Sequence, residues 1–282
     1  MLKFIKGYRL YEALLMTGFF IIGSFFGINL ISVNSIGLLI ISAIISLLVV
    51  LSVYSYNAAA GKSTDKNNPR LNSLNLITKK SFQLSGITFS LLAIATSAFL
   101  SLEIALVCTF VNIIWIGYSH PKYGLKYKPY FGTILHFFAQ IIQFNMCYLI
   151  FDSIDLYSIA LSLYFALAFS TGHLHHEIID FESDKAAGFR TTTIKHGITK
   201  VKNTIIAICT FNLFIVLLLH LFTIVNLISF IIMIVPIIIH ILLYLIFNKT
   251  IAIKAIQIRS FYRLIYFSCF AVFIVYKIIT LY

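Results

Sequence analysis

Residues 36–56 read IGLLIISAIISLLVVLSVYSY, a run without a single Asp, Glu, Lys or Arg. A helix that crosses the hydrocarbon core of a membrane needs about 20 mostly apolar residues, so this run predicts a membrane-spanning helix. Working outward, we find similar runs at 12–33, 84–100, 101–118, 131–151, 156–174, 203–223, 226–247 and 262–281.

The number of spans depends on how the third and fourth of these runs are divided. Only Ser101, Leu102 and Glu103 separate them, and one long helix in their place would leave eight spans. Lys and Arg occur in every second loop when nine spans are assumed, whereas with eight spans the alternation fails halfway. Because cytoplasmic loops carry the excess of Lys and Arg, the sequence predicts nine helices, a cytoplasmic N-terminus and an external C-terminus.

The composition supports a membrane protein and excludes several other classes. The chain of 282 residues is 60% hydrophobic and only 11% charged, whereas soluble domains have about 25% charged residues. The net charge of +12 would suggest nucleic acid in a soluble protein, but here topology and membrane lipids explain it. The four Cys residues lie inside apolar runs and imply neither a disulfide nor a zinc site.

We therefore expect an all-α membrane protein with one domain over residues 1–282. Two long polar loops, 57–83 and 175–202, fall on the predicted cytoplasmic side and would cap a central cavity. Because no targeting segment is recognisable, we expect a multi-pass protein of an inner or plasma membrane, with its reaction site facing the cytoplasm.

Four acidic residues crowd into the second long loop, where residues 175–197 read HHEIIDFESDKAAGFRTTTIKHG. If the preceding helix extends into this segment, Asp180 and Asp184 share one face, flanked by His176 and Glu177. Clustered carboxylates repel one another unless a cation lies between them, and hard oxygen ligands suit Mg²⁺. The alternative is a solvated acidic helix end.

The first long loop carries a weaker pattern, since residues 56–75 read YNAAAGKSTDKNNPRLNSLN. Asn57, Gly61 and Asp65 are spaced by four and would line one helix face.

A third loop reads YSHPKYGLKYKP over residues 118–129. Its Tyr and Lys side chains could contact an anionic group, although a topology signal explains the lysines equally well.

Carboxylates, amides and cations on one side of the membrane are the mixture that binds an oligophosphate through Mg²⁺. Beneath them lies an apolar interior rich in Phe (27 residues) and Tyr (16 residues). A substrate with a diphosphate head and a hydrocarbon tail matches both halves, and aromatic faces can stabilise a carbocation.

In the order and spacing of these motifs, the sequence resembles the UbiA superfamily of intramembrane prenyltransferases. The family's DxxxD motif, followed by Gly and a Thr-rich stretch, corresponds to Asp180 and Asp184, Gly188 and Thr191–Thr193, with Glu177 three residues earlier. The family's YSxP…LK loop and the NPxR-like ending of its first motif match Tyr118, Ser119, Pro121, Leu125, Lys126 and Asn67 through Arg70.

The resemblance implies a Mg²⁺-dependent enzyme that ionises an isoprenoid diphosphate and transfers the prenyl group to an aromatic or lipid acceptor. Asn57 and Asp65 would hold one metal ion, and Asp180 and Asp184, joined by Glu177, would hold the other. The diphosphate would be bound by Lys126, Tyr118, Arg70 and Lys62.

One departure from the family leaves a second reaction open. Ala58 follows Asn57 and Gly61 stands at the usual position of the middle Asp, so one carboxylate is missing. This version of the motif resembles the terpene cyclases of the superfamily, in which the substrate's own double bonds attack the cation. Transfer is favoured only because it is the commoner activity.

Two other classes of protein fit the sequence less well. His173, His175 and His176 beside Glu177 could suggest a membrane di-iron oxygenase, but the other histidines are scattered singly. A transporter would place ionisable residues near the middle of the membrane, whereas here the acids lie at the interface.

Overall fold

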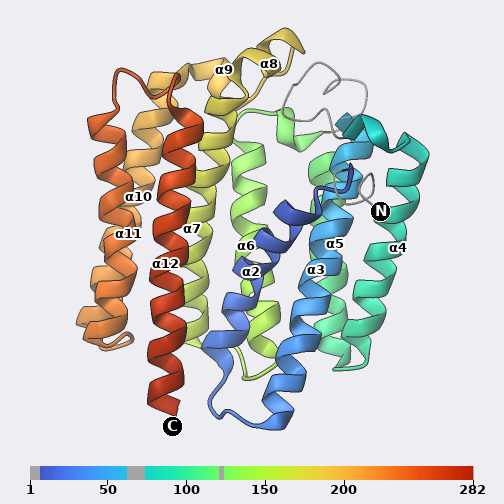
Figure 1. Cartoon of the computed structure of the whole chain (residues 1–282), viewed down its shortest axis with the longest axis vertical. Helices are drawn as coiled ribbons and strands as arrows, with labels where there is room; N and C mark the ends of the chain where they lie inside the picture. Colours follow the sequence, from blue (N-terminus) through green and yellow to red (C-terminus); the bar gives the residue numbers. More distant parts are fainter. Residues whose placement is uncertain (1–6, 62–73, 121–123, 282) are drawn as a thin grey trace.

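The computed structural model describes residues 7–61, 74–120 and 124–281. Nearly all long segments are helical and run along the long axis of the molecule (Figure 1). The long helices are α2 (Leu10–Gly27), α3 (Val33–Gly61), α4 (Lys79–Ala98), α5 (Leu102–Ser119), α6 (Phe131–Leu149), α7 (Leu156–Ile179), α10 (Ile198–Leu221), α11 (Leu227–Ile246) and α12 (Ala255–Leu281). Short helices are η3 (Leu125–Tyr127), α8 (Phe181–Ala186) and α9 (Thr192–His196).

Six helices of the described residues are long and apolar enough to cross a membrane: α3, α4, α5, α10, α11 and α12. Helices α6 and α7 are not among these six, and both carry buried polar residues such as Gln140, Gln143 and His175. The chain is therefore an integral, multi-pass membrane protein, while the count of nine spans and their sidedness stay predictions.

Helices α4 and α5 are separate, so the third and fourth apolar runs of the sequence do not form one long helix. Ser101 has extended backbone angles, and its hydroxyl accepts a hydrogen bond from the Ile104 N–H at 3.1 Å. This N-cap starts a new helix at Leu102 and stops α4 from continuing through the turn.

Several helices extend beyond the apolar runs of the sequence. Helix α3 continues to Gly61, α7 continues to Ile179, and α10 begins at Ile198. The expected loop 175–202 is consequently mostly helical, since α8 and α9 occupy its middle. Helix ends that reach water tolerate polar residues, so hydropathy alone placed these boundaries too close to the membrane centre.

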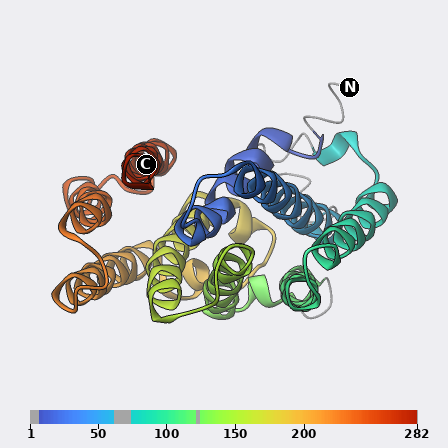
Figure 2. The same ribbon diagram turned by 90° about the horizontal axis from the view of Figure 1, so that it is seen from below.

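The helices form two groups that α2 and α6 join. One buried apolar cluster includes residues of α3, α4 and α5, and the other includes residues of α7, α10, α11 and α12. Both clusters contain residues of α2 and α6, and Figure 2 shows these helices between the two groups. Helices α2 and α6 therefore pack against both groups of helices.

Helices α2 and α6 approach closely because α2 presents glycine at the contact. A Cβ atom added at Gly23 would lie 2.2 Å from the backbone oxygen of Phe144. At Gly27 it would lie 2.9 Å from the backbone oxygen of Tyr148. No flexible side chain can move aside there, so the two helices would have to separate.

We expect Gly23→Ala to destabilise the protein by about 1–3 kcal/mol through overpacking. The measurement is the midpoint of thermal unfolding in detergent. Gly18→Ala on the same helix is the matched control, because a Cβ atom there meets nothing within 4 Å. An equal midpoint for the two variants would contradict the close contact.

Candidate functional site

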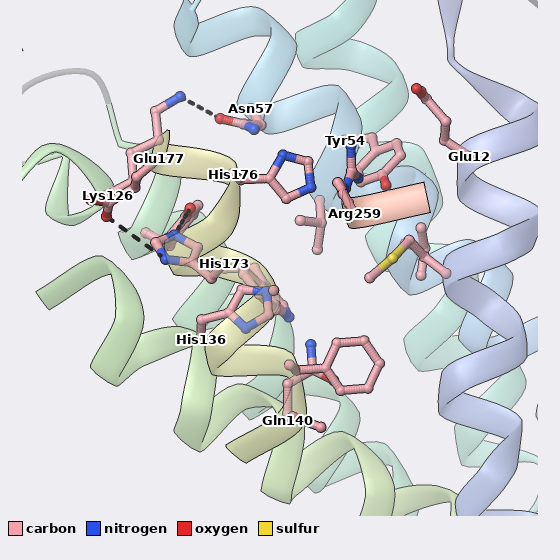
Figure 3. Close-up of a pocket in the computed structure, with 18 of the residues that line it drawn as sticks. Glu12, Tyr54, Asn57, Lys126, His136, Gln140, His173, His176, Glu177 and Arg259 are labelled. Carbon is pink, nitrogen blue, oxygen red and sulfur yellow. Dashed lines mark hydrogen bonds and ion pairs between the residues drawn. The ribbon is translucent and has the colours of Figure 1, made fainter. Parts of the chain in front are cut away.

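A cavity of about 350 Å³ lies between α2, α3, α5, α6, α7 and α12 (Figure 3). It reaches from Asp184 and Thr191, at the α8–α9 end of the bundle, to Ile22 and Phe270 deeper inside. Its volume falls in the range of about 300–1,000 Å³ that is usual for small-ligand sites.

The structure brings together most of the site residues expected from the sequence. Lys62, Asp65 and Arg70 lie outside the described residues. The others all line this cavity: Asn57, Tyr118, Lys126, Glu177, Asp180 and Asp184.

Asp180 and Asp184 are positioned by α7 and α8, which only Asp180 separates. Asp180 ends α7 and precedes α8, and its carbonyl accepts a hydrogen bond from the Asp184 N–H at 2.8 Å. The helical spacing expected from the sequence is therefore kept. Gly188 ends this unit with φ at 73°, where its N–H donates to the Lys185 carbonyl and the Phe189 N–H donates to the Asp184 carbonyl. This is the Schellman ending, which explains the glycine of the motif.

Glu177 fastens α9 to the end of α7. Its carboxylate accepts hydrogen bonds from the Thr193 N–H at 2.8 Å, the Thr193 hydroxyl at 3.1 Å and the Thr192 hydroxyl at 3.3 Å. The side chain is only 8% exposed. Its two oxygens are thus engaged inside the protein, and the threonines of the sequence motif have a structural role.

Lys126 lies across the same end of the cavity. Its ammonium donates a hydrogen bond to the Asn57 side-chain oxygen at 2.5 Å and lies 4.5 Å from the centre of the Tyr127 ring. Tyr127 stacks on Phe189 with ring centres 3.8 Å apart and an angle of 18°. This stack ties the loop that carries Lys126 to the segment that carries Asp184.

Tyr130 adds two further ties between these segments. Its backbone N–H donates to the Thr192 hydroxyl at 3.1 Å, and its hydroxyl lies 2.6 Å from the His196 Nε2. The residues near 126 and those near 190 are therefore joined by two hydrogen bonds and a ring stack.

Tyr118 reaches the cavity from α5. Its hydroxyl is 3.1 Å from the His173 Nε2, while the His173 Nδ1 lies 3.2 Å from the Thr133 hydroxyl and 3.8 Å from a Glu177 oxygen. His173 thus links α5, α6 and α7 just below the acidic residues.

Sequence reasoning missed a second basic edge. Arg9, Arg259 and Arg263 line the cavity, together with Glu12 and Tyr54. Figure 3 shows Glu12, Tyr54 and Arg259 on the side opposite Lys126 and Glu177, with His176 between the two sides. The sequence identifies these arginines only as topology signals, although the spacing of Arg259 and Arg263 by four puts them on one helix face.

Arg9 is held by its neighbours as a permanent cation. It forms an ion pair with Glu12, and its guanidinium lies 5.2 Å from the centre of the Tyr54 ring. Burial by itself lowers the pKa of Arg9, but the hydrogen bond to Glu12 and the charges of Tyr54, Glu12 and Asp180 raise it above its ordinary value. Arg9 therefore stays charged, but Glu12 offsets its charge, so the net positive charge of this edge comes from Arg259 and Arg263.

The adjacent histidines do not share one face. His173 and His176 line the cavity, whereas the ring of His175 hydrogen-bonds to the Tyr244 hydroxyl and to the Ala255 carbonyl. Within the described ranges, no group of three or more His, Cys, Asp and Glu residues is arranged to hold a metal ion. The histidine pattern that suggested a di-iron site is thus divided between two sides of α7.

The oxygen atoms at this end of the cavity nevertheless suit Mg²⁺. Asp180 and Asp184 offer carboxylates, and Asn57 would offer its amide oxygen once the hydrogen bond from Lys126 is exchanged for the metal ion. Mg²⁺ takes one or two carboxylates and fills its remaining positions with water and phosphate oxygens. A complete protein cage is therefore unnecessary when the ligand itself brings phosphate.

Comparison with known proteins agrees with this architecture. A model of the UbiA prenyltransferase family matches residues 15–276. No curated protein sequence matches the chain.

Among solved structures, a UbiA homolog from Archaeoglobus fulgidus has 20% identity and a TM-score of 0.75, covering 99% of each chain. The same homolog bound to DMAPP and Mg²⁺ has 19% identity and a TM-score of 0.72, covering 96% of this chain and 99% of that one. A digeranylgeranylglyceryl phosphate synthase has 16% identity and a TM-score of 0.74, covering 98% of each chain. At such identities the likeness shows the fold.

The tie between Glu177 and α9 yields a prediction. We expect Glu177→Ala to speed hydrogen exchange at the Thr193 amide about tenfold or more, because a hydrogen bond to a charged group contributes about 1.5–3 kcal/mol. Hydrogen exchange followed by mass spectrometry measures this, with the exposed Glu182→Ala as the matched control. Unchanged protection of residues 191–196 would show that Glu177 does not hold α9.

Proposed function

This chain belongs to the UbiA prenyltransferase family, and we propose that it ionises an isoprenoid diphosphate and transfers the prenyl group to an aromatic or lipid acceptor. One observation carries the proposal: two carboxylates, an amide oxygen and several cations line one end of a cavity whose deeper walls are largely apolar and aromatic.

We propose that Asp180, Asp184 and Asn57 hold Mg²⁺, with Asp65 completing the set. The A. fulgidus homolog binds DMAPP and GPP with Mg²⁺, and UbiA-type enzymes use this ion. When bound, Mg²⁺ neutralises the charge that develops on the departing pyrophosphate. Glu177 belongs to the support of the site in this proposal, because its carboxylate already accepts hydrogen bonds from Thr192 and Thr193.

The diphosphate would lie between two basic edges. Lys126 lies on one side, with Tyr118 beneath it, while Arg9 and Arg259 lie on the other. Lys62 and Arg70, which lie outside the described residues, would add further positive charge. Preorganised cations of this kind stabilise the leaving group most strongly where water is excluded.

Below the diphosphate, aromatic side chains would receive the allylic cation. Tyr262, Tyr266 and Phe270 from α12 and Phe165 and Phe169 from α7 line the cavity there. The faces of such rings attract cations. The same walls are apolar enough to hold an isoprenoid tail.

We also propose that this end of the bundle faces the cytoplasm. Arg9, Lys126 and Arg259 come from three separate segments and line the same cavity end as the acidic residues. An excess of Lys and Arg is typical of the cytoplasmic side of a membrane protein.

The second candidate function is a terpene cyclase of the same fold. Gly61 favours it, since this residue ends α3 one helical turn after Asn57, where a further carboxylate is usual. A cyclase would need the same diphosphate site but no acceptor.

To test the proposed metal site, we would replace Asp180 or Asp184 by Asn, which keeps the shape but removes the charge. We expect pyrophosphate release from farnesyl diphosphate to fall about 100-fold or more, with partial recovery at high Mg²⁺, because a metal ligand is lost. Glu182→Gln is the matched control, since Glu182 is exposed and does not line the cavity. Full activity of both Asp variants in well-inserted protein would refute the metal site.

Products formed without an acceptor separate the two candidate reactions. The purified protein is incubated with Mg²⁺ and geranyl, farnesyl or geranylgeranyl diphosphate alone, and the products are identified by gas chromatography with mass spectrometry. We expect no cyclised hydrocarbon from a transferase. Accumulation of a cyclic product under these conditions would establish the cyclase instead.

A further inference from the structure

Helix α12 brings two arginines to the cavity, yet little of the helix is buried. Figure 2 shows it at the outside of the bundle, next to α11. Its buried residues over the described range 255–280 are Ala255, Ile258, Tyr262 and Phe273. Three of these four belong to the first eight residues of the helix, so α12 is held mainly at its N-terminal end. Where apolar contacts are this few, single polar contacts decide how firmly a segment is held.

His175 supplies such a contact at the N-terminal end of α12. Its ring is 0% exposed and lies on a different side of α7 from the cavity-lining His173 and His176. The His175 Nε2 is 2.7 Å from the Ala255 carbonyl oxygen, and the Nδ1 hydrogen-bonds to the Tyr244 hydroxyl of α11. One side chain therefore joins α7, α11 and α12.

The two hydrogen bonds occupy both nitrogens of the ring. A carbonyl oxygen can only accept, so the His175 Nε2 donates to Ala255. The Nδ1 of the neutral ring then accepts, and the Tyr244 hydroxyl donates to it. Neither nitrogen is left for a ligand or for proton transfer in the cavity. The role of His175 is consequently to join helices.

Ring contacts fix the rotation of α12 about its own axis. Tyr262 meets the His175 ring edge-on at 5.4 Å and stacks on the His240 ring of α11, with centres 4.1 Å apart and an angle of 22°. Tyr262 follows Ala255 by seven residues, which is about two helical turns, so both contacts fall on one face of α12. Arg259, four residues after Ala255, falls on the same face and lines the cavity.

His175 is also close in sequence to the acidic edge of the cavity. Asp180 follows it by five residues and directly follows the last turn of α7. On the other side, Ala255 is the first residue of α12 and precedes Arg259 by four. The bond between His175 and Ala255 therefore sets the spacing between the helix that leads to Asp180 and the helix that carries Arg259.

We propose that His175 is a positioning residue that holds Arg259 across the diphosphate site from Asp180 and Asp184. The proposal rests on the proposed diphosphate site and adds a residue that does not line the cavity. Hydrogen bonds between a guanidinium and phosphate oxygens weaken steeply as distance and angle depart from their optimum. A small displacement of α12 thus lowers the affinity for a diphosphate.

Binding of inorganic pyrophosphate with Mg²⁺ tests this role without turnover. Isothermal titration calorimetry on the purified protein in detergent measures the affinity. His175→Leu nearly keeps the side-chain volume but removes the donor to Ala255, and we expect it to weaken binding about tenfold. His175→Gln should bind within twofold of the unaltered protein, because its amide N–H can still donate to the Ala255 carbonyl.

A matched control removes the same kind of hydrogen bond at the other end of the bundle. The His220 Nδ1 lies 3.1 Å from the Val225 carbonyl oxygen, in the turn between α10 and α11. We expect His220→Leu to change pyrophosphate affinity less than twofold, because this turn is remote from Arg259.

A double variant separates positioning of Arg259 from general loosening of the fold. Arg259→Met alone should weaken pyrophosphate binding about tenfold. If His175 acts through Arg259, adding His175→Leu to Arg259→Met should weaken binding less than threefold further, because the guanidinium is already gone. Two effects that multiply to about 100-fold would show independent action and overturn the proposal.

Tyr244→Phe takes the place of His175→Leu if that variant is not recovered as folded protein. It removes one hydroxyl and leaves the ring packing, so we expect pyrophosphate binding about threefold weaker. Unchanged affinity in His175→Leu, or in Tyr244→Phe where it stands in, would overturn the positioning role alone. Absence of pyrophosphate binding by the unaltered protein would contradict the proposed function itself, and the positioning role with it.

Discussion

The carboxylate of Glu177 and the first residues of α9 form the contact on which the cavity entrance depends. The Thr193 N–H and the hydroxyls of Thr192 and Thr193 converge on this carboxylate at the end of α7. The chain between them is thereby closed into a short loop that carries both Asp180 and Asp184. Because Tyr127 stacks on Phe189 from this loop, the position of Lys126 is tied to the same contact.

The arrangement separates two kinds of chemistry along the bundle. Charged groups gather at the α8–α9 end, where water and ions can reach them, and aromatic and amide side chains line the interior. Electrostatic interactions strengthen as the surroundings become less polar, so these charges act most strongly on a diphosphate whose binding displaces water from the cavity entrance. A prenyl cation formed there would enter a space lined by Phe169, Tyr262 and Tyr266.

Much of this could be predicted from the sequence, because hydropathy and charge alternation are local signals. The helical extension that puts Asp180 and Asp184 together was also readable, since i and i+4 share a face. The second basic edge was not predicted, because Arg9 and Arg259 are 250 residues apart in the sequence and line the same cavity only in the folded chain.

The polar side chains of α6 that line the cavity were not predicted, for a different reason. Gln140 and Gln143 are single polar residues in an apolar run. Only the folded structure shows that both line the same cavity. The metal role of Asp65 stays a prediction, because this residue lies outside the described part of the chain.

The central claim is that Asp180 and Asp184 hold a magnesium diphosphate at the mouth of an aromatic cavity. A crystal structure with Mg²⁺ and farnesyl thiolodiphosphate, which resists ionisation, tests it most directly. The account predicts a metal ion in contact with Asp180 or Asp184, the diphosphate beside Lys126, and the farnesyl tail between α7 and α12. A diphosphate bound elsewhere, with its metal touching neither aspartate, would contradict it.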